Sequence, residues 1–143
     1  MKYIIAICIA SLSAFAASAQ TISITKAGKN YEHIETSSAS QTLLKVNALL
    51  AWSITAHLSA TSNWDSSLKL SVQRTGNGTG IAILTGGTTY IQLTSTPQAF
   101  FSGLLNLTAS RDNIPIQYKI EGLSVMLPVK TYTTTVTYTI SGL

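Results

Sequence analysis

The chain has 143 residues, with nine Lys and Arg against five Asp and Glu, a formal net charge of +4. Only 10% of the residues are charged, and the basic ones are scattered along the sequence, which argues against a nucleic-acid partner. The single cysteine, Cys8, lies near the N-terminus, so the rest of the chain can hold neither a disulfide nor a thiolate metal site.

The N-terminal stretch has the pattern of a secretory signal peptide. Lys2 precedes an apolar run over residues 4–10, and the small residues Ala17, Ser18 and Ala19 follow. The run is shorter than the roughly 20 residues of a membrane-spanning helix. We therefore expect cleavage after Ala19, with residues 1–19 as the signal peptide, and export to the periplasm, the cell surface or the medium.

The first expected strands are short. Residues 21–25 alternate between polar and apolar side chains, with Ile22 and Ile24 on one face. Turn-forming residues follow over 26–30, and residues 31–34 form a second short strand.

The longest regular segment runs from Leu44 to Leu58, where every even position is apolar. A strand of this length exceeds the usual range, so the pattern predicts a bulge, a bend or a strand that passes from one sheet to another. A helix over residues 41–52 is the competing interpretation. We favour a strand because the alternation continues beyond Trp52 into β-branched residues.

The middle of the chain alternates between short strands and turns. A loop is expected over 60–67, a strand from Leu68 to Val72 and a glycine-rich turn over 75–80. Gly86 and Gly87 separate two apolar runs, a spacing typical of a tight hairpin. A strand is expected within residues 100–109.

The last two expected strands show the clearest alternation. Residues 114–120 form one, and Pro115 indicates an edge strand or the beginning of a strand. In residues 131–140 every odd position is threonine, which predicts a half-buried strand with a hydroxylated outer face. The sequence therefore predicts an all-β protein in which residues 20–143 form a single antiparallel β-sandwich, immunoglobulin-like or pilin-like, of about seven to nine strands.

The end of the chain resembles small secreted bacterial β-sandwich proteins. The resemblance covers residues 114–140, through the runs Ile114-Pro115-Ile116-Gln117-Tyr118, Leu127-Pro128 and Tyr132-Thr133-Thr134-Thr135-Val136-Thr137-Tyr138-Thr139-Ile140. Spore coat U-like proteins, pilin-like subunits and WxL-type surface domains end similarly. The resemblance implies a non-enzymatic, surface-displayed protein of adhesion, fibres or coats. Chaperone–usher pilins differ from this chain at Gly142, where they carry an aromatic residue, and at Lys130, where they carry glycine.

Reactive side chains are too few and too dispersed to indicate an enzyme. The candidates are His33, His57, Glu32, Glu35, Asp65, Asp112 and Glu121. A glycosidase needs two carboxylates facing one cleft, and Glu32, His33 and Glu35 lack the ligand count of a recognised metal site. We therefore expect no catalytic residues, no metal site and no cofactor.

Two segments are candidates for binding. Trp64 lies between Asn63 and Asp65 in an expected loop, an arrangement that suits sugar stacking, although Trp64 as a lid over the core is an alternative. The strand that holds Ile22 and Ile24 is a candidate for assembly through a sheet edge. We expect a structural or adhesive protein, either a fibre or pilus-like subunit or a carbohydrate-binding module, whose partners are its own copies, other surface proteins or glycans.

Overall fold

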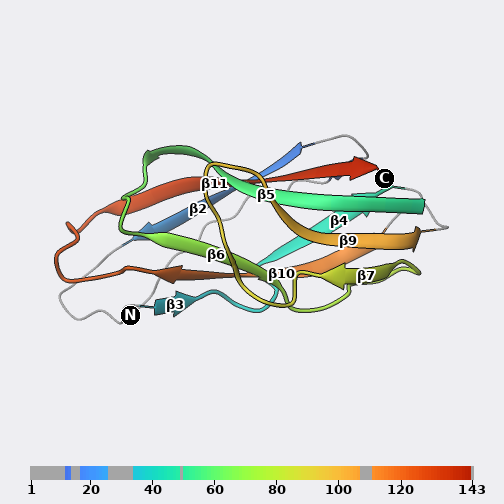
Figure 1. The fold of residues 1–143 in the computed structure, drawn as a ribbon. Coiled ribbons are helices and arrows are strands. Elements are labelled where there is room, and N and C mark those ends of the chain that lie inside the picture. Colours follow the sequence, from blue (N-terminus) through green and yellow to red (C-terminus); the bar gives the residue numbers. More distant parts are fainter. Residues whose placement is uncertain (1–11, 14–16, 26–33, 49, 107–110, 143) are drawn as a thin grey trace.

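The structure is a computed structural model, and it describes residues 12–13, 17–25, 34–48, 50–106 and 111–142. Within these ranges the chain forms strands, turns and bends but no helix, so no helix there could cross a membrane. Two sheets pack face to face as an elongated β-sandwich, which confirms the predicted fold class (Figure 1).

The described residues form eleven strands, more than expected, because the two-residue β1 was not predicted and the long alternating segment over residues 44–58 divides into two strands. In chain order they are β1 (Leu12–Ser13), β2 (Ala17–Thr25), β3 (Ile34–Thr36), β4 (Thr42–Asn47), β5 (Leu50–Asn63), β6 (Lys69–Arg74), β7 (Ile83–Gly86), β8 (Ile91–Gln92), β9 (Gln98–Asn106), β10 (Arg111–Glu121) and β11 (Thr131–Gly142).

One sheet has the order β1-β4-β10-β6-β8, and β3 pairs with β10 beyond the first residue of β4, Thr42. The other has the order β2-β11-β5-β9-β7. Every pairing is antiparallel except the two-residue contact of β1 with β4. The chain therefore ends on a strand, β11, that lies between the N-terminal β2 and the long β5.

The long alternating segment passes from one sheet to the other. It divides into β4 in the first sheet and β5 in the second, and Leu50 takes a positive φ of 61° at the crossing. The predicted strand that changes sheets is confirmed, and the competing helix over residues 41–52 is wrong. Alternation persisted because both strands bury their even-numbered side chains against the same core.

The hairpin predicted at Gly86 and Gly87 is wrong. Both glycines take the positive φ of such a turn, 84° and 75°, but β7 and β8 belong to different sheets. From β4 to β11, every connection passes from one sheet to the other. The apolar runs on each side of the glycines were read correctly as strands, whereas their pairing depended on distant partners.

Pro115 does not mark an edge or a strand beginning, because it lies inside β10, between β4 and β6. The carbonyl of Pro115 accepts a hydrogen bond from the N–H of Thr75 (2.9 Å), so the proline nitrogen also faces that side. There β6 has already ended at Arg74. The missing N–H therefore falls beside the glycine-rich turn and interrupts no strand ladder.

Other boundaries also moved. The loop expected from residue 60 begins later, since β5 continues to Asn63 opposite Thr133 of β11. The strand expected at 31–34 lies outside the described residues except for Ile34, which begins β3, and residues 107–109 of the strand expected at 100–109 also lie outside them.

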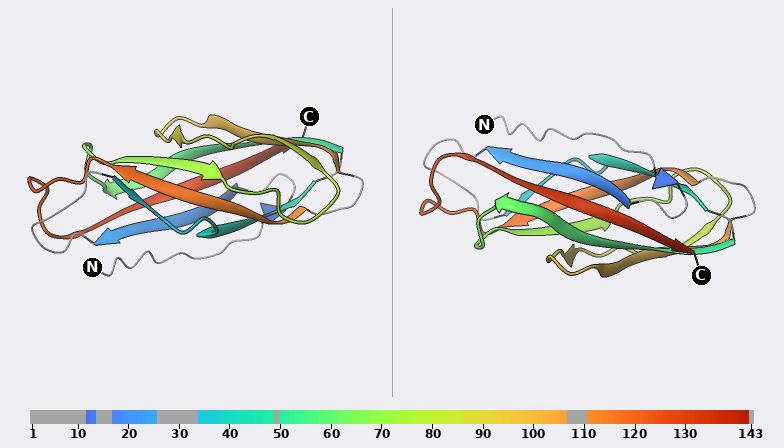
Figure 2. Two further views of the ribbon diagram at one scale, coloured as in Figure 1. Left: turned by 90° about the horizontal axis from the view of Figure 1, so that it is seen from below. Right: turned by 90° about the horizontal axis from the view of Figure 1, so that it is seen from above.

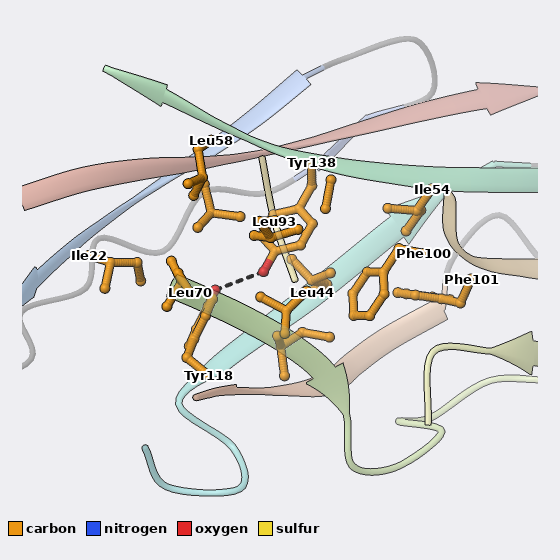
Figure 3. Packing of buried hydrophobic residues seen from close by; sticks show 14 of the residues in the cluster. Ile22, Leu44, Ile54, Leu58, Leu70, Leu93, Phe100, Phe101, Tyr118 and Tyr138 are labelled. Carbon is orange, nitrogen blue, oxygen red and sulfur yellow. Dashed lines mark hydrogen bonds between the residues drawn. The ribbon is translucent and has the colours of Figure 1, made fainter. Parts of the chain in front are cut away.

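The core lies between the sheets, and its apolar side chains come from both (Figure 3). Three buried hydroxyls cross it: Thr42 bonds Tyr118 at 3.0 Å, and Tyr118 bonds Tyr138 at 2.9 Å. Burial raises the pKa of Tyr118 and raises that of Tyr138 further. The hydroxyl chain joins the first sheet to the second.

The sandwich has two distinct ends. We call the end with loop 122–130 the hinge end, because the chain passes from β2 to β3 there. Strand β2 finishes opposite Thr131, and β3 begins opposite Glu121. At the far end, β5 begins at Leu50 and β11 finishes at Gly142. Both views in Figure 2 place loop 122–130 and the C-terminus at opposite ends.

Candidate functional site

The strand β2, near the N-terminus, is an edge strand, and among the described strands it pairs only with β11. Its register runs from Thr25 opposite Thr131 to Ala17 opposite Thr139, an antiparallel ladder of nine residue pairs. Polar and apolar residues alternate over 21–25, and this pattern suits a strand with one buried face. The other side of β2 carries no strand among the described residues.

The two residues predicted for assembly, Ile22 and Ile24, both lie on β2. Ile22 is 1% exposed and belongs to the core, near Tyr118 and Leu70 in the view of Figure 3. The backbone of Ile24 lies opposite Tyr132. Strand β2 is therefore attached by its ladder to β11 and by at least one side chain inserted between the sheets.

The predicted signal peptidase site falls within β2. Cleavage after Ala19 would remove β1 and the first three residues of β2, and Gln20–Thr25 would remain opposite Thr131–Val136. The backbone edge of β11 at Thr137, Tyr138 and Thr139 would then lose its partner.

The structure places Asn63, Trp64 and Asp65 at the hinge end, where β5 leads into β6. Asn63 is exposed as the last residue of β5. Trp64 is half-buried, packs against the core, and donates its indole N–H to the carbonyl of Leu68 at 3.1 Å. The geometry of Trp64 corresponds to a lid over the edge of the core.

Asp65 is engaged within its own turn. One carboxylate oxygen accepts hydrogen bonds from the hydroxyl of Ser67 (2.7 Å) and the N–H of Ser67 (2.9 Å). These bonds lower the pKa of Asp65, with the side-chain bond as the largest cause. The carbohydrate site of Asn63, Trp64 and Asp65 stays a prediction, and these contacts give the indole and the carboxylate partners inside the protein.

The other reactive side chains lie apart. Glu121 pairs with Lys119 at 3.1 Å, and Asp112 pairs with Lys45 at 3.3 Å near the opposite end. Within the described ranges, no three His, Cys, Asp or Glu residues lie close enough to hold a metal ion. Glu32 and His33 lie outside those ranges.

Two buried arginines at the far end were not anticipated. Arg74 and Arg111 are 6% and 5% exposed, and we call them the arginine clasp because both hold the glycine-rich turn at 75–80. Arg74 donates to the carbonyls of Gly86 and Gly76 and to the side chain of Asn77. Arg111 donates to the carbonyls of Asn77 and Gly80.

The sequence contains a signal for one member of the clasp. Arg74 follows Leu68, Leu70 and Val72 at every second position. Because these three side chains are buried, the alternation indicates that Arg74 also points inward. The register of β10 with β4 shifts between Arg111 and Ile114. Arg111 therefore does not follow the alternation that begins at Ile114, and its burial is visible only in the structure.

Comparison of the chain with protein families, with curated proteins and with solved structures gives no match.

Proposed function

We propose that this protein is a non-enzymatic structural or adhesive subunit, exported to the periplasm or cell surface, that assembles with its own copies by exchanging β2. The single observation that carries the proposal is the position of β2. It is an edge strand near the N-terminus that pairs with no described strand except β11, and its Ile22 is inserted in the core.

Edge strands are the usual route for adding another chain to a sheet, because their backbone groups can pair with it. The proposed cleavage after Ala19 removes β1, which otherwise pairs with β4. Residues 26–33 connect β2 to β3, so the remaining part of β2 can then leave β11 without disturbing the order of the other strands. In a second copy it would form the same ladder and bury Ile22 in the same place. Such an exchange retains the bonds of the closed molecule at little cost in free energy.

The outer surface of the second sheet supports a structural role. Thr133, Thr135, Thr137 and Thr139 lie half-exposed along β11, next to the outward side chains of β5. Ser59 and Thr137 are hydrogen-bonded across these strands at 2.8 Å. A neutral hydroxylated face of this kind suits an exported protein with few charged residues.

A deletion of residues 20–26 tests the proposal. We expect oligomers of the parent protein, seen by size-exclusion chromatography and electron microscopy, to disappear in the deletion variant. A synthetic peptide with the deleted sequence, residues 20–26, should then bind this variant, because the vacated edge of β11 opposite Gln20–Thr25 is its acceptor. Mass spectrometry of the exported parent should show Gln20 as its first residue.

Point variants provide the matched control. Ile22→Asp places a charge in the core and should abolish assembly, whereas Thr21→Asp changes the exposed neighbour on the same strand and should preserve it. Circular dichroism should show a β spectrum for both. Unchanged assembly of the Ile22→Asp protein, or a strictly monomeric parent, would contradict the proposal.

A further inference from the structure

The exposed hydrophobic side chains of this molecule gather at its two ends. Nine large hydrophobic side chains are exposed in the described part of the chain, and only Leu43 lies away from the ends. The hinge end carries Ile34, Val125, Met126 and Val129, and the far end carries Leu50, Ile81, Ile83 and Leu104.

The hinge-end patch, defined as Ile34, Val125, Met126 and Val129, sits on an anchored loop. Leu123 and Leu127 of the same loop are buried in the core. Met126 is nevertheless 87% exposed, and Val125 and Val129 are 68% and 69% exposed. Four such side chains expose an apolar surface on the order of 300 Å², which is within the range of the largest apolar patch on a typical monomer, and such patches are often functional.

The strand proposed to exchange leaves the sandwich at this same end. The backbone of Thr25 lies opposite Thr131, and that of Ile34 lies opposite Glu121, so both flank loop 122–130. The eight residues between Thr25 and Ile34 can span at most about 30 Å. The fourteen residues of β5 extend over about 45 Å, which sets the length of the sandwich.

These lengths restrict how two copies can exchange β2. The donated strand would finish at the hinge end of the acceptor, and its connection must reach the hinge end of the donor. A head-to-tail arrangement would separate these points by the length of the sandwich, which the connection cannot span. Exchange must therefore bring two hinge ends together.

We infer that exchange of β2 closes two copies into a two-fold symmetric dimer at the hinge end, with their apolar patches buried against each other. The inference rests on the proposed function and fixes its partner as a second copy of this chain. In a two-fold interface the same patch serves both copies, so an apolar surface can cover its own image. The two patches contribute on the order of 600 Å², and two exchanged strands add to it, toward the ~1,200 Å² of a specific interface.

A cysteine pair tests the exchange. Thr21 and Thr135 are directly opposite on β2 and β11 and both face outward, so their Cβ atoms are within reach of a cross-link. The full chain is expressed with the substitutions Thr21→Cys and Thr135→Cys in a Cys8→Ser background. The protein is purified after any cleavage by the host and is then oxidised. We expect a covalent dimer on a denaturing gel and a dimer by light scattering.

Charge substitutions test the location of the interface. Met126→Glu at the hinge end should raise the dimer dissociation constant at least tenfold, measured by analytical ultracentrifugation. Ile81→Glu is the matched control, since Ile81 is 63% exposed at the far end, and it should leave the constant unchanged. The reverse pattern would overturn the inference.

The outcomes distinguish the inference from the proposed function. Disulfides between chains in open fibres would overturn the closed dimer and would leave strand exchange standing. Disulfides within monomers only would overturn both.

Discussion

At the scale of single residues, the hydroxyl chain of Thr42, Tyr118 and Tyr138 is the main polar feature of the core. Each hydroxyl has a partner, so its burial carries no unpaired-group penalty. Because Thr42 and Tyr118 belong to the first sheet and Tyr138 to the second, the bonds also fix how the sheets face each other.

Removal of one hydroxyl should change both stability and its pH dependence. Burial raises the pKa of Tyr138 well above 10, so the unfolded chain loses this proton before the folded protein does. The free energy of unfolding should therefore fall as the pH rises above about 10. Tyr138→Phe should cost about 1 kcal/mol at pH 7 and make this decline shallower. Urea unfolding from pH 7 to 11 measures both, and an unchanged decline would contradict the role of Tyr138.

Gly103 lies directly beneath a tryptophan. A Cβ at this position would overlap the indole ring of Trp52, which is fully buried. Gly103→Ala should therefore destabilise the protein by about 1–3 kcal/mol, because the core must move to accept the methyl group. Gly142→Ala is the control, since its Cβ would meet nothing within 4 Å. Equal unfolding midpoints for both variants would show that Trp52 can shift freely.

At the scale of elements, the arginine clasp explains how a turn rich in glycine is held in place. Arg74 and Arg111 direct their N–H groups at carbonyls of the turn, and neither contacts a carboxylate in the described part of the chain. Burial and the charge of Arg111 lower the pKa of Arg74. The glycine-rich turn is also hydrogen-bonded to β10, through the backbone bridge between Thr79 and Asp112.

Arg111→Lys keeps the charge but loses the planar set of donors. We expect it to destabilise the protein by about 1–3 kcal/mol, because the carbonyls of Asn77 and Gly80 lose their partner. Hydrogen exchange should become faster in the turn at 75–80. Lys45→Gln, which breaks only the exposed ion pair with Asp112, should change stability by less than about 1 kcal/mol. Slower or unchanged exchange in Arg111→Lys would contradict the clasp.

Alternation predicted most strands because one buried face imposes a period of two residues on the sequence. It could not predict partners, which depend on contacts between distant segments. Gly86 and Gly87 have the conformation of a hairpin turn, yet the strands beside them join different sheets. Pro115 is tolerated in a central strand only because β6 has ended beside it.

The same limit applies to the candidate site. Alternation around Ile22 predicted a strand with a buried face, but its pairing with β11 came from the fold. From the sequence, Trp64 was compatible with a sugar-stacking platform or with a lid over the core. In the structure, the hydrogen bond from its indole N–H to the carbonyl of Leu68 holds it in the lid orientation. The placement of Ile34 at the same end as Val125 and Met126 depends on the register of β3 with β10, which no local pattern contains.

At the scale of the whole molecule, polar and apolar surfaces are separated. The outer face along β11 carries hydroxyls, whereas the exposed large hydrophobic side chains lie mostly at the ends. Each connection from β4 to β11 passes from one sheet to the other, so the chain links the two layers repeatedly. Neither sheet can form from consecutive strands alone, so we regard the sandwich as one cooperative unit.

The register of β2 with β11 also determines how the molecule responds to mechanical load. The two strands are antiparallel, so the start of β2 points toward the end of the sandwich where β11 finishes, and Gln20, the proposed first residue of the exported protein, lies opposite Val136. Tension applied between these two points would peel the ladder apart one hydrogen bond at a time. Tension along the long axis through an exchanged strand would instead shear many bonds at once. A linked pair would therefore resist pulling forces better than the closed single chain.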